Sequence, residues 1–337
     1  MSLQVLAHAH SCADYVLPVY CFDPRHYQST YHFNFPKTGA HRVKYVLESV
    51  TDLRQTLRGR GSDLMIVHGK PEDAITRIHN LLKGSALSVI CQSEVTKEET
   101  DVENQLQKIC RENRSNFIKI WGSTLYHKSD IPFSIKTIPD NYTSFRKDVE
   151  FKSSIRPEIV MPQMLKPLPK LELSLGDLPS YQSLNSEKPH PVSHSAFPFS
   201  GGETAGLQRL KSYLWDTDAV AQYKQTRNGL VGAEYSTKFS PWLSLGSLSP
   251  RRIHWEIEKY ERERTKNDST YWVRFELLWR DYFKFVTMKY GDRIFYPFGM
   301  KGKRIAWKKD KELFQAWQSK LIVINYSFIN WTNKTEN

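Results

Sequence analysis

Short apolar runs alternate with segments of helical periodicity over the first 121 residues, and this alternation restricts the fold more than any other feature of the sequence. The apolar runs predict strands over residues 15–21, 64–68, 86–92 and 117–121. The periodic segments predict helices over residues 41–58, 71–83 and 97–113, after the end of a helix over residues 3–9. Strands that alternate with helices predict a parallel, doubly wound sheet, which binds ligands beyond the carboxyl ends of its strands.

The organisation changes after residue 150. Residues 157–198 hold eight of the 17 prolines and many serines, so they predict a connector on the surface. From residue 202 the pattern is helical: Ser249 and Pro250 begin one helix, and residues 270–289 predict a long aromatic helix. We therefore expect an α/β domain (1–150), a linker (151–201), a helical domain (202–318) and a tail (319–337).

The positive charge of the chain is concentrated in its C-terminal part. The formal net charge is +12, of which the residues after 200 contribute +9. This distribution indicates a polyanionic partner, nucleic acid first, although a solvated basic face would give the same composition.

Four cysteines without a CxxC pair predict neither a disulfide framework nor a zinc site, and they fit a reducing, intracellular setting. No apolar run approaches membrane-spanning length, and no targeting signal is visible at the N-terminus. The sequence does not distinguish nucleus, cytoplasm and organelle.

Residues 223–252 combine hydroxyls, glycines and cations ahead of a helix. Thr237, Lys238, Phe239 and Ser240 form a polar cluster of the kind that binds phosphate, although no GxGxxG or Walker A pattern is present. Tyr223 and Arg227 lie four residues apart, which places them on one face of a helix. From spacing alone, a polar turn before a proline-started helix is the favoured explanation of the segment.

Two further segments carry residues that suit a nucleic acid. Glu276, Trp279 and Arg280 share one face of the aromatic helix, where they could recognise a planar base or form only an internal ion pair beside a core tryptophan. Beyond that helix, basic residues surround Trp307, which suits a nucleic-acid strand or plain solvation. These basic residues are Lys301, Lys303, Arg304, Lys308, Lys309 and Lys311.

These segments together resemble a known family. The run QYKQTRNG…EYSTKFSPWLSLGSLSPR resembles the flavin-binding segment of the photolyase/cryptochrome family, specifically its DASH-type cryptochromes, and FELLWRDYF resembles the family's substrate helix. The resemblance covers residues 4–318 and implies an α/β domain followed by a helical FAD-binding domain.

The resemblance also implies roles for individual residues. The implied FAD contacts are Tyr223, Thr237, Lys238, Phe239, Ser240 and Arg280. Glu276 and Trp279 match residues that touch a flipped pyrimidine dimer, and Trp307 matches the outermost tryptophan of an electron-transfer chain to the flavin. Glu150 matches a contact to the antenna cofactor, 5,10-methenyltetrahydrofolate.

The function implied is that of a blue-light flavoprotein, a DNA photolyase that splits cyclobutane pyrimidine dimers, preferably in single-stranded DNA. A second reading is a cryptochrome photoreceptor that binds DNA or proteins without repair. Whether this chain is an enzyme stays open, because its two ends depart from the family pattern.

The departures predict an incomplete fold. Family members begin with one more strand, central to their sheet, and residues 319–337 do not match the helices that complete the flavin pocket. We therefore expect a sheet without its first strand, a partial helical domain, and weak or absent FAD binding, as in a truncated isoform.

Overall fold

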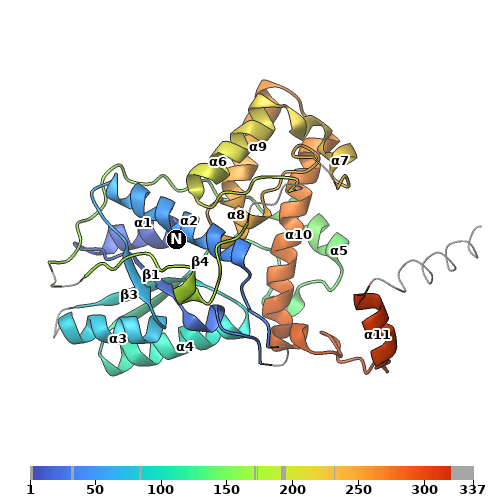
Figure 1. The fold of residues 1–337 in the computed structure, drawn as a ribbon. Coiled ribbons are helices and arrows are strands. Elements are labelled where there is room, and N and C mark those ends of the chain that lie inside the picture. Colours follow the sequence, from blue (N-terminus) through green and yellow to red (C-terminus); the bar gives the residue numbers. More distant parts are fainter. Residues whose placement is uncertain are drawn as a thin grey trace, which may run out of the picture. The chain divides into compact units, whose positions relative to one another are not determined.

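The ribbon of a computed structural model of the chain is drawn in Figure 1. The structure describes residues 3–31, 34–82, 86–170, 172, 174–190, 195–230 and 232–319. All structural statements below concern these residues.

Four parallel strands form the centre of the N-terminal part. They are β1 (Val19–Phe22), β2 (Met65–His68), β3 (Ser88–Ser93) and β4 (Asn116–Trp121). β1 pairs with β2, and β3 pairs with β4, but within the described chain no ladder joins the two pairs. The predicted parallel pairing is confirmed, and the strands form two halves instead of one continuous sheet.

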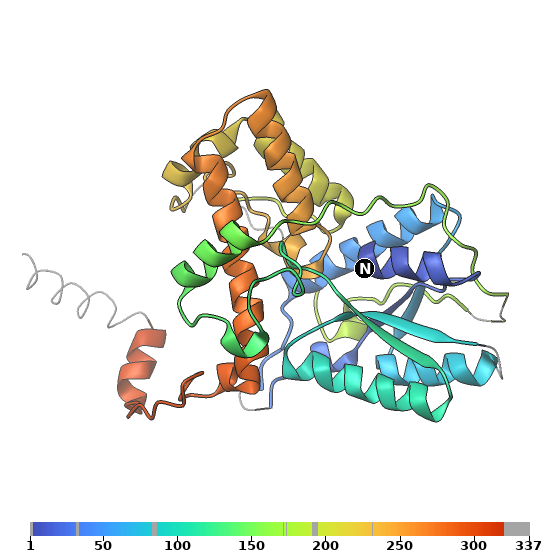
Figure 2. The same ribbon diagram turned by 180° about the vertical axis from the view of Figure 1, so that it is seen from behind.

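Helices cover both sides of these strands. They are α1 (Leu3–Cys12), α2 (Ala40–Arg58), α3 (Pro71–Leu82) and α4 (Lys97–Glu112). α1 and α2 lie on one side, and α3 and α4 lie on the other, as the two opposite views show (Figures 1 and 2). α2 faces the strands because Val43, Val46 and Val50, spaced by three and four residues, are buried.

The predicted strand over residues 15–21 begins later than expected, at Val19. Pro18 has no backbone N–H and cannot take part fully in a ladder. Before it, the N–H of Val16 donates to Pro167 O at 3.0 Å, so this stretch pairs with the connector instead.

The connector is fixed to the N-terminal part by specific contacts. The N–H of Ile66 in β2 donates to Leu175 O at 2.7 Å, and the Arg54 guanidinium donates to Gly176 O at 2.8 Å. A Cβ at Gly176, which has φ of 65°, would lie 2.3 Å from Ile66 O, so this close approach requires glycine. The connector therefore follows the outer edge of β2.

The remaining part of the first unit is helical. Its helices are α5 (Tyr142–Lys152), α6 (Glu203–Lys211), α7 (Tyr223–Thr226), α8 (Ser240–Leu245), α9 (Pro250–Glu263) and α10 (Asp268–Tyr290). The predicted start of α9 is confirmed, because the Ser249 side chain caps it and Pro250 is its first residue. Asn267 and Thr270 form a capping box at the start of α10.

One apolar core joins the end of the α/β part to the helices. Trp121 at the end of β4 stacks on Phe285 of α10, with ring centroids 5.8 Å apart and an interplanar angle of 15°. Phe145 of α5 and Tyr213 are fully buried in the same core. A second core under α2 contains Val43, Val46 and Leu57.

The chain divides into two compact units, Met1–Gly291 and Asp292–Asn337. The second contains α11 (Lys311–Gln318), which Asp310 caps by accepting from Leu313 N at 2.9 Å. The domain boundaries expected at residues 150, 201 and 318 stay predictions. The tail expected to diverge, 319–337, lies outside the described residues except for Ser319.

No helix that the structure describes is both long and apolar enough to cross a membrane.

Candidate functional site

The loop that carries Thr237 and Lys238 is built around one buried guanidinium. Arg209 of α6 donates from Nε to Thr237 O at 3.0 Å, and from Nη2 to Ala233 O at 2.8 Å and Ser236 O at 3.1 Å. Its Nη1 forms an ion pair with Glu234 at 3.0 Å. Three carbonyl groups of the loop therefore face the same cation.

Aromatic rings enclose this guanidinium. The carbon Cζ of Arg209 lies 4.9 Å from the ring centres of both Phe197 and Tyr213, and the side chain is only 3% exposed. The Tyr213 hydroxyl is buried and has no hydrogen-bond partner among the described residues. Burial raises the pKa of Tyr213, so this hydroxyl is a neutral polar group beside the loop.

The four loop residues predicted to bind FAD differ in exposure. Phe239 is buried with its ring 6.0 Å from that of Tyr213, Thr237 and Lys238 are half-buried, and Ser240 is exposed. Lys238 has φ of 59°, a left-handed conformation that costs a non-glycine residue energy. α8 spans only six residues after this point, so the loop itself, more than the helix, presents polar groups here.

Tyr223 and Arg227 meet Glu276 across the helical part. Arg227 N donates to Tyr223 O at 3.0 Å, and its Nη1 contacts Glu276 Oε1 at 2.5 Å. The same guanidinium lies 4.7 Å from the ring centre of Trp272. Burial, followed by the nearby Glu276 charge, raises the pKa of Tyr223 against the opposing effect of Arg227.

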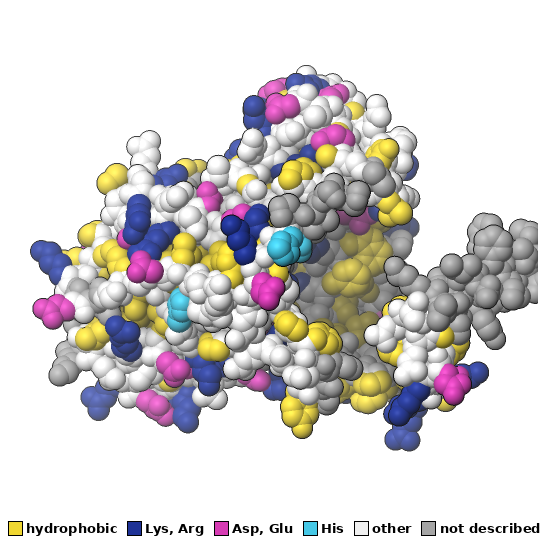
Figure 3. Space-filling view, in the orientation of Figure 1, with side chains coloured by type: hydrophobic (Ala, Val, Ile, Leu, Met, Phe, Trp, Pro, Cys, Tyr) yellow, Lys and Arg dark blue, Asp and Glu magenta, His cyan; other side chains and the backbone are white. Residues whose placement is uncertain are grey.

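Trp279 belongs to a group of stacked aromatic rings. Its ring centroid lies 3.6 Å from that of Tyr142, with an interplanar angle of 13°, and 5.4 Å from that of Phe283. The Tyr142 hydroxyl donates to Phe275 O at 2.9 Å, which fixes α5 against α10. Phe283 is 60% exposed, and apolar side chains gather in a recess over α10 and α5 in Figure 3.

Arg280 is held by backbone carbonyls. Its guanidinium donates to Ser123 O after β4 and to Leu243 O in α8 at 3.2 Å. Burial lowers the pKa of Arg280. The structure therefore uses this predicted FAD residue to connect α10 to two other segments.

Glu150 lies at the end of α5 in a polar network. Glu150 Oε2 accepts from Arg146 at 2.8 Å, and its Oε1 accepts from the Tyr271 hydroxyl at 2.8 Å. Tyr271 and Arg146 also contact each other, at 2.6 Å. This places the predicted antenna residue on the surface between α5 and α10.

Trp307 belongs to the second unit. It is 64% exposed, and its Nε1 donates to Pro297 O at 3.2 Å. The six basic residues around it are exposed as well. In the described part of the chain, no group of three or more His, Cys, Asp or Glu side chains is placed to hold a metal ion.

Sequence reasoning missed three residues of this site, Arg209, Tyr142 and Phe283. One signal for Arg209 was present, because it lies four residues before Tyr213 on the apolar face of a helical segment. Tyr142 could not be paired with Trp279 from spacing, since the two belong to different helices.

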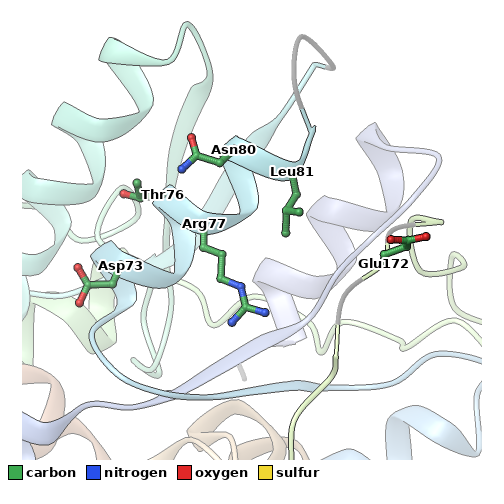
Figure 4. Close-up of a pocket in the computed structure, with 6 residues that line it drawn as sticks. All are labelled: Asp73, Thr76, Arg77, Asn80, Leu81 and Glu172. Atoms are coloured by element: carbon green, nitrogen blue, oxygen red, sulfur yellow. The ribbon is translucent and has the colours of Figure 1, made fainter.

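A cavity of about 460 Å3 lies elsewhere, against α3 (Figure 4). It is lined by Asp73, Thr76, Arg77, Asn80, Leu81 and Glu172. It contains none of the residues predicted from the sequence, and we do not assign the function to it.

Comparisons with known proteins bear on the family and the fold of the chain. Residues 4–169 match the family model described as DNA photolyase. Cryptochrome DASH of Xenopus laevis is 53% identical over 316 residues, which cover 94% of this chain and 60% of that protein. The chain thus spans about 60% of the length of this curated relative.

Solved structures share the fold. The cryptochrome of Synechocystis sp. PCC6803 aligns with a TM-score of 0.88 and 43% identity, covering 94% of this chain and 65% of that one. An archaeal photolyase from Sulfolobus tokodaii, solved with two FAD molecules, aligns with a TM-score of 0.68 and 22% identity, covering 94% and 64%. The second likeness concerns the fold alone.

Proposed function

Because the chain belongs to the photolyase/cryptochrome family, as a DASH-type member, we propose that it acts as a blue-light flavoprotein that repairs cyclobutane pyrimidine dimers. The observation that best supports this is the ion pair that joins Arg227, at the end of α7, to Glu276 of α10, the helix that also carries Trp279. A carboxylate and an indole three residues apart suit a base that must be both hydrogen-bonded and stacked.

The residues of the loop fit FAD. Tyr223, Thr237, Lys238, Phe239 and Ser240 would hold its diphosphate and sugar. The Tyr213 hydroxyl, which has no hydrogen-bond partner among the described residues, is a buried polar group beside them. When bound, reduced FAD supplies on excitation an electron that the split dimer returns. Arg280 would lie by the flavin only after releasing at least one of its carbonyl partners.

Glu276 and Trp279 would recognise the damaged base. The Glu276 carboxylate accepts hydrogen bonds from ring N–H groups once the pair with Arg227 opens, and both partners are already about one-third exposed. The Arg227 guanidinium is then available for a phosphate of the strand. Flipping a base out costs least where it is unpaired, which favours single-stranded DNA as the substrate.

Two further roles stay proposals. Glu150 would contact the folate antenna, 5,10-methenyltetrahydrofolate, in place of one of its present partners, Arg146 or Tyr271. Trp307 would be the outer member of an electron-transfer chain, which suits its exposure of 64%.

A spectrum and a light-driven assay test the proposal. If the chain acts as proposed, the purified protein shows flavin absorbance and splits a dimer in a single-stranded oligonucleotide under blue light, in contrast to the weak or absent FAD binding that the sequence predicts. Glu276→Gln should weaken binding of the damaged strand by tenfold or more, whereas Glu258→Gln, which removes another partly exposed α-helical carboxylate, should not. Flavin absorbance without dimer splitting would favour a photoreceptor without repair.

A chain that does not hold FAD is the second candidate. The observation that favours it is Arg280, which is 3.2 Å from Leu243 O and also bound to Ser123 O, and is therefore not free for a flavin. A colourless purified protein that stays colourless after incubation with FAD would establish this candidate and contradict the first.

The expected incompleteness of the fold also stays a proposal. It is supported by the separate pairs β1–β2 and β3–β4, and by the apolar side chains that α11 exposes, Leu313, Phe314 and Trp317. Strand edges and apolar helix faces of this kind usually have a partner in a finished domain.

A further inference from the structure

We infer that Arg209 is a positioning residue that shapes loop 233–238 into a cradle for the diphosphate of a dinucleotide. The inference rests on the proposed function, because the ligand class is that of FAD. Arg209 itself is too deeply buried, at 3% exposure, to touch such a ligand, so its effect must pass through the loop.

The carbonyl groups that face Arg209 determine where the amide hydrogens of the loop point. In a planar trans peptide the C=O and the N–H of the same unit point in opposite directions. Since the carbonyls of Ala233, Ser236 and Thr237 point at the guanidinium, the N–H groups of Glu234, Thr237 and Lys238 point away from it.

These N–H groups are available to a ligand. None of the three has a hydrogen-bond acceptor in the described part of the chain, and neither do the N–H groups of Phe239 and Ser240. The residue Phe239 is buried, and Glu234, Thr237 and Lys238 are half-buried. Buried or half-buried amide donors are nearly always paired in folded proteins, so these four without acceptors indicate a missing ligand or solvent.

The backbone around Lys238 adds a second sign of anion binding. Lys238 is left-handed, with φ of 59°, and Phe239 is right-handed, with φ of −73° and ψ of −15°. Such a change of hand turns successive N–H groups toward one point, which makes a concave site for an anion. The Lys238 side chain then supplies positive charge at the same place.

The chemistry of the cation explains why an arginine occupies this position. A guanidinium has five donors in a planar fork, and Arg209 uses them on three carbonyls and the Glu234 carboxylate. Lysine has a single compact charge and could not hold all four acceptors in one plane. The rings of Phe197 and Tyr213 on the guanidinium exclude water that would compete for these bonds.

The test compares Arg209→Met and Arg209→Lys with Arg54→Met in the full chain. Arg54 is a matched control, because it is also largely buried and binds one carboxylate, Asp63, and one carbonyl, Gly176 O, far from the loop in sequence. The probes are inorganic pyrophosphate and ADP, followed by calorimetry and by the backbone amide signals of loop residues 234–240.

We expect Arg209→Met to weaken ADP binding by at least tenfold, Arg209→Lys to weaken it less, and Arg54→Met to change it less than twofold. In the wild type, pyrophosphate should shift the amide signals of Thr237 and Lys238. A folded Arg209→Met variant that binds ADP within twofold of the wild type would overturn the inference.

The wild-type amide signals keep the inference testable if the Arg209 variants do not fold. Signals of residues 234–240 that do not move with pyrophosphate or ADP would overturn it. If these signals move while the chain neither binds FAD nor splits dimers, the cradle stands and the proposed function fails.

Discussion

At the scale of single residues, Asp281 shows how a buried charge can be tolerated. It lies fully buried on α10 and accepts from the N–H groups of Leu125 at 2.9 Å and Tyr126 at 2.8 Å. Burial raises the pKa of Asp281 to about 7, although the two amide donors and the charges of Arg280 and Lys284 act in the opposite direction.

This shift predicts a pH dependence of stability. An unfolded aspartate titrates near pH 3.8, so between about pH 4 and pH 7 the folded state binds more protons than the unfolded state. The contribution of Asp281 to the free energy of unfolding should therefore decrease as the pH rises through this range. The substitution Asp281→Asn removes this titration. It also loses one of the two hydrogen bonds from backbone amides, at a cost of about 1–3 kcal/mol.

Urea unfolding at several pH values checks this prediction. The difference in unfolding free energy between wild type and Asp281→Asn should shrink as the pH rises from 4 to 7. Asp130→Asn is a control with the opposite pH dependence. The hydrogen bond from Arg156 lowers the pKa of Asp130, so the contribution of Asp130 to the free energy of unfolding is lost as the pH falls. An Asp281→Asn difference that does not vary with pH would contradict the argument.

Residue identities were easier to predict than their partners. The sequence indicated Tyr223, Arg227 and Glu276 as members of a site. It could not indicate that Arg227 and Glu276, 49 residues apart, would form an ion pair, because spacing predicts contacts only within one helix. The role of Arg209 depends on where a loop folds back, which no local pattern encodes.

At the scale of elements, helices were predicted more closely than strands. α4 and α9 begin within a residue of their expected starts, because proline, serine and acidic residues mark the first turn. β1 begins four residues later than expected, because Pro18 and a bond from Val16 to the connector interrupt it. The division of the sheet into two pairs depends on long-range pairing and could not be derived from periodicity.

The division of the strands into two separate pairs, β1–β2 and β3–β4, predicts a pattern of amide hydrogen exchange along β1 and β3. The N–H of Met65 donates to Pro18 O, so the backbone polar groups of Pro18 face β2. Along a strand these groups face opposite edges in successive residues, so the N–H groups of Tyr20 and Phe22 face β2 and that of Cys21 faces the opposite edge. In the other pair, the N–H of Asn116 donates to Leu87 O. By the same reasoning, the N–H of Ile90 faces away from β4.

We expect the amides of Cys21 and Ile90 to exchange with solvent deuterium at least tenfold faster than those of Tyr20 and Phe22. Exchange followed by nuclear magnetic resonance on the whole chain measures this ratio. Equal protection on both edges would mean that another group pairs with the free edges in solution.

At the scale of the whole molecule, the charge distribution favours association with a polyanion. Of the formal net charge of +12, most comes from residues after 200. Lys308 and Lys309 are exposed in the second unit beside Trp307, a combination that suits a strand with phosphates and stacked bases.

Binding of single-stranded DNA should therefore depend strongly on salt. Each phosphate contact contributes about −0.7 to the slope of log Kobs against log salt, so Lys308→Gln with Lys309→Gln should reduce the slope by about 1.4. Fluorescence anisotropy with an oligothymidylate at several salt concentrations measures this slope. Lys108→Gln with Arg111→Gln on α4 is the control, and an equal effect of both pairs would show that only net charge matters.

The connector has a practical consequence for the integrity of the chain. Its far end is bonded to α2, where Glu48 accepts from Gly201 N at 2.9 Å and Ser49 accepts from Gly202 N at 3.0 Å, while Val160 is 87% exposed in its middle. Cleavage by a site-specific protease near residue 160 should leave two fragments that co-elute on gel filtration, held by the core that Trp121 and Phe285 share. The chain could then be produced as two separate polypeptides, each fused to another protein, and their reassembly would report whether the two fused proteins meet.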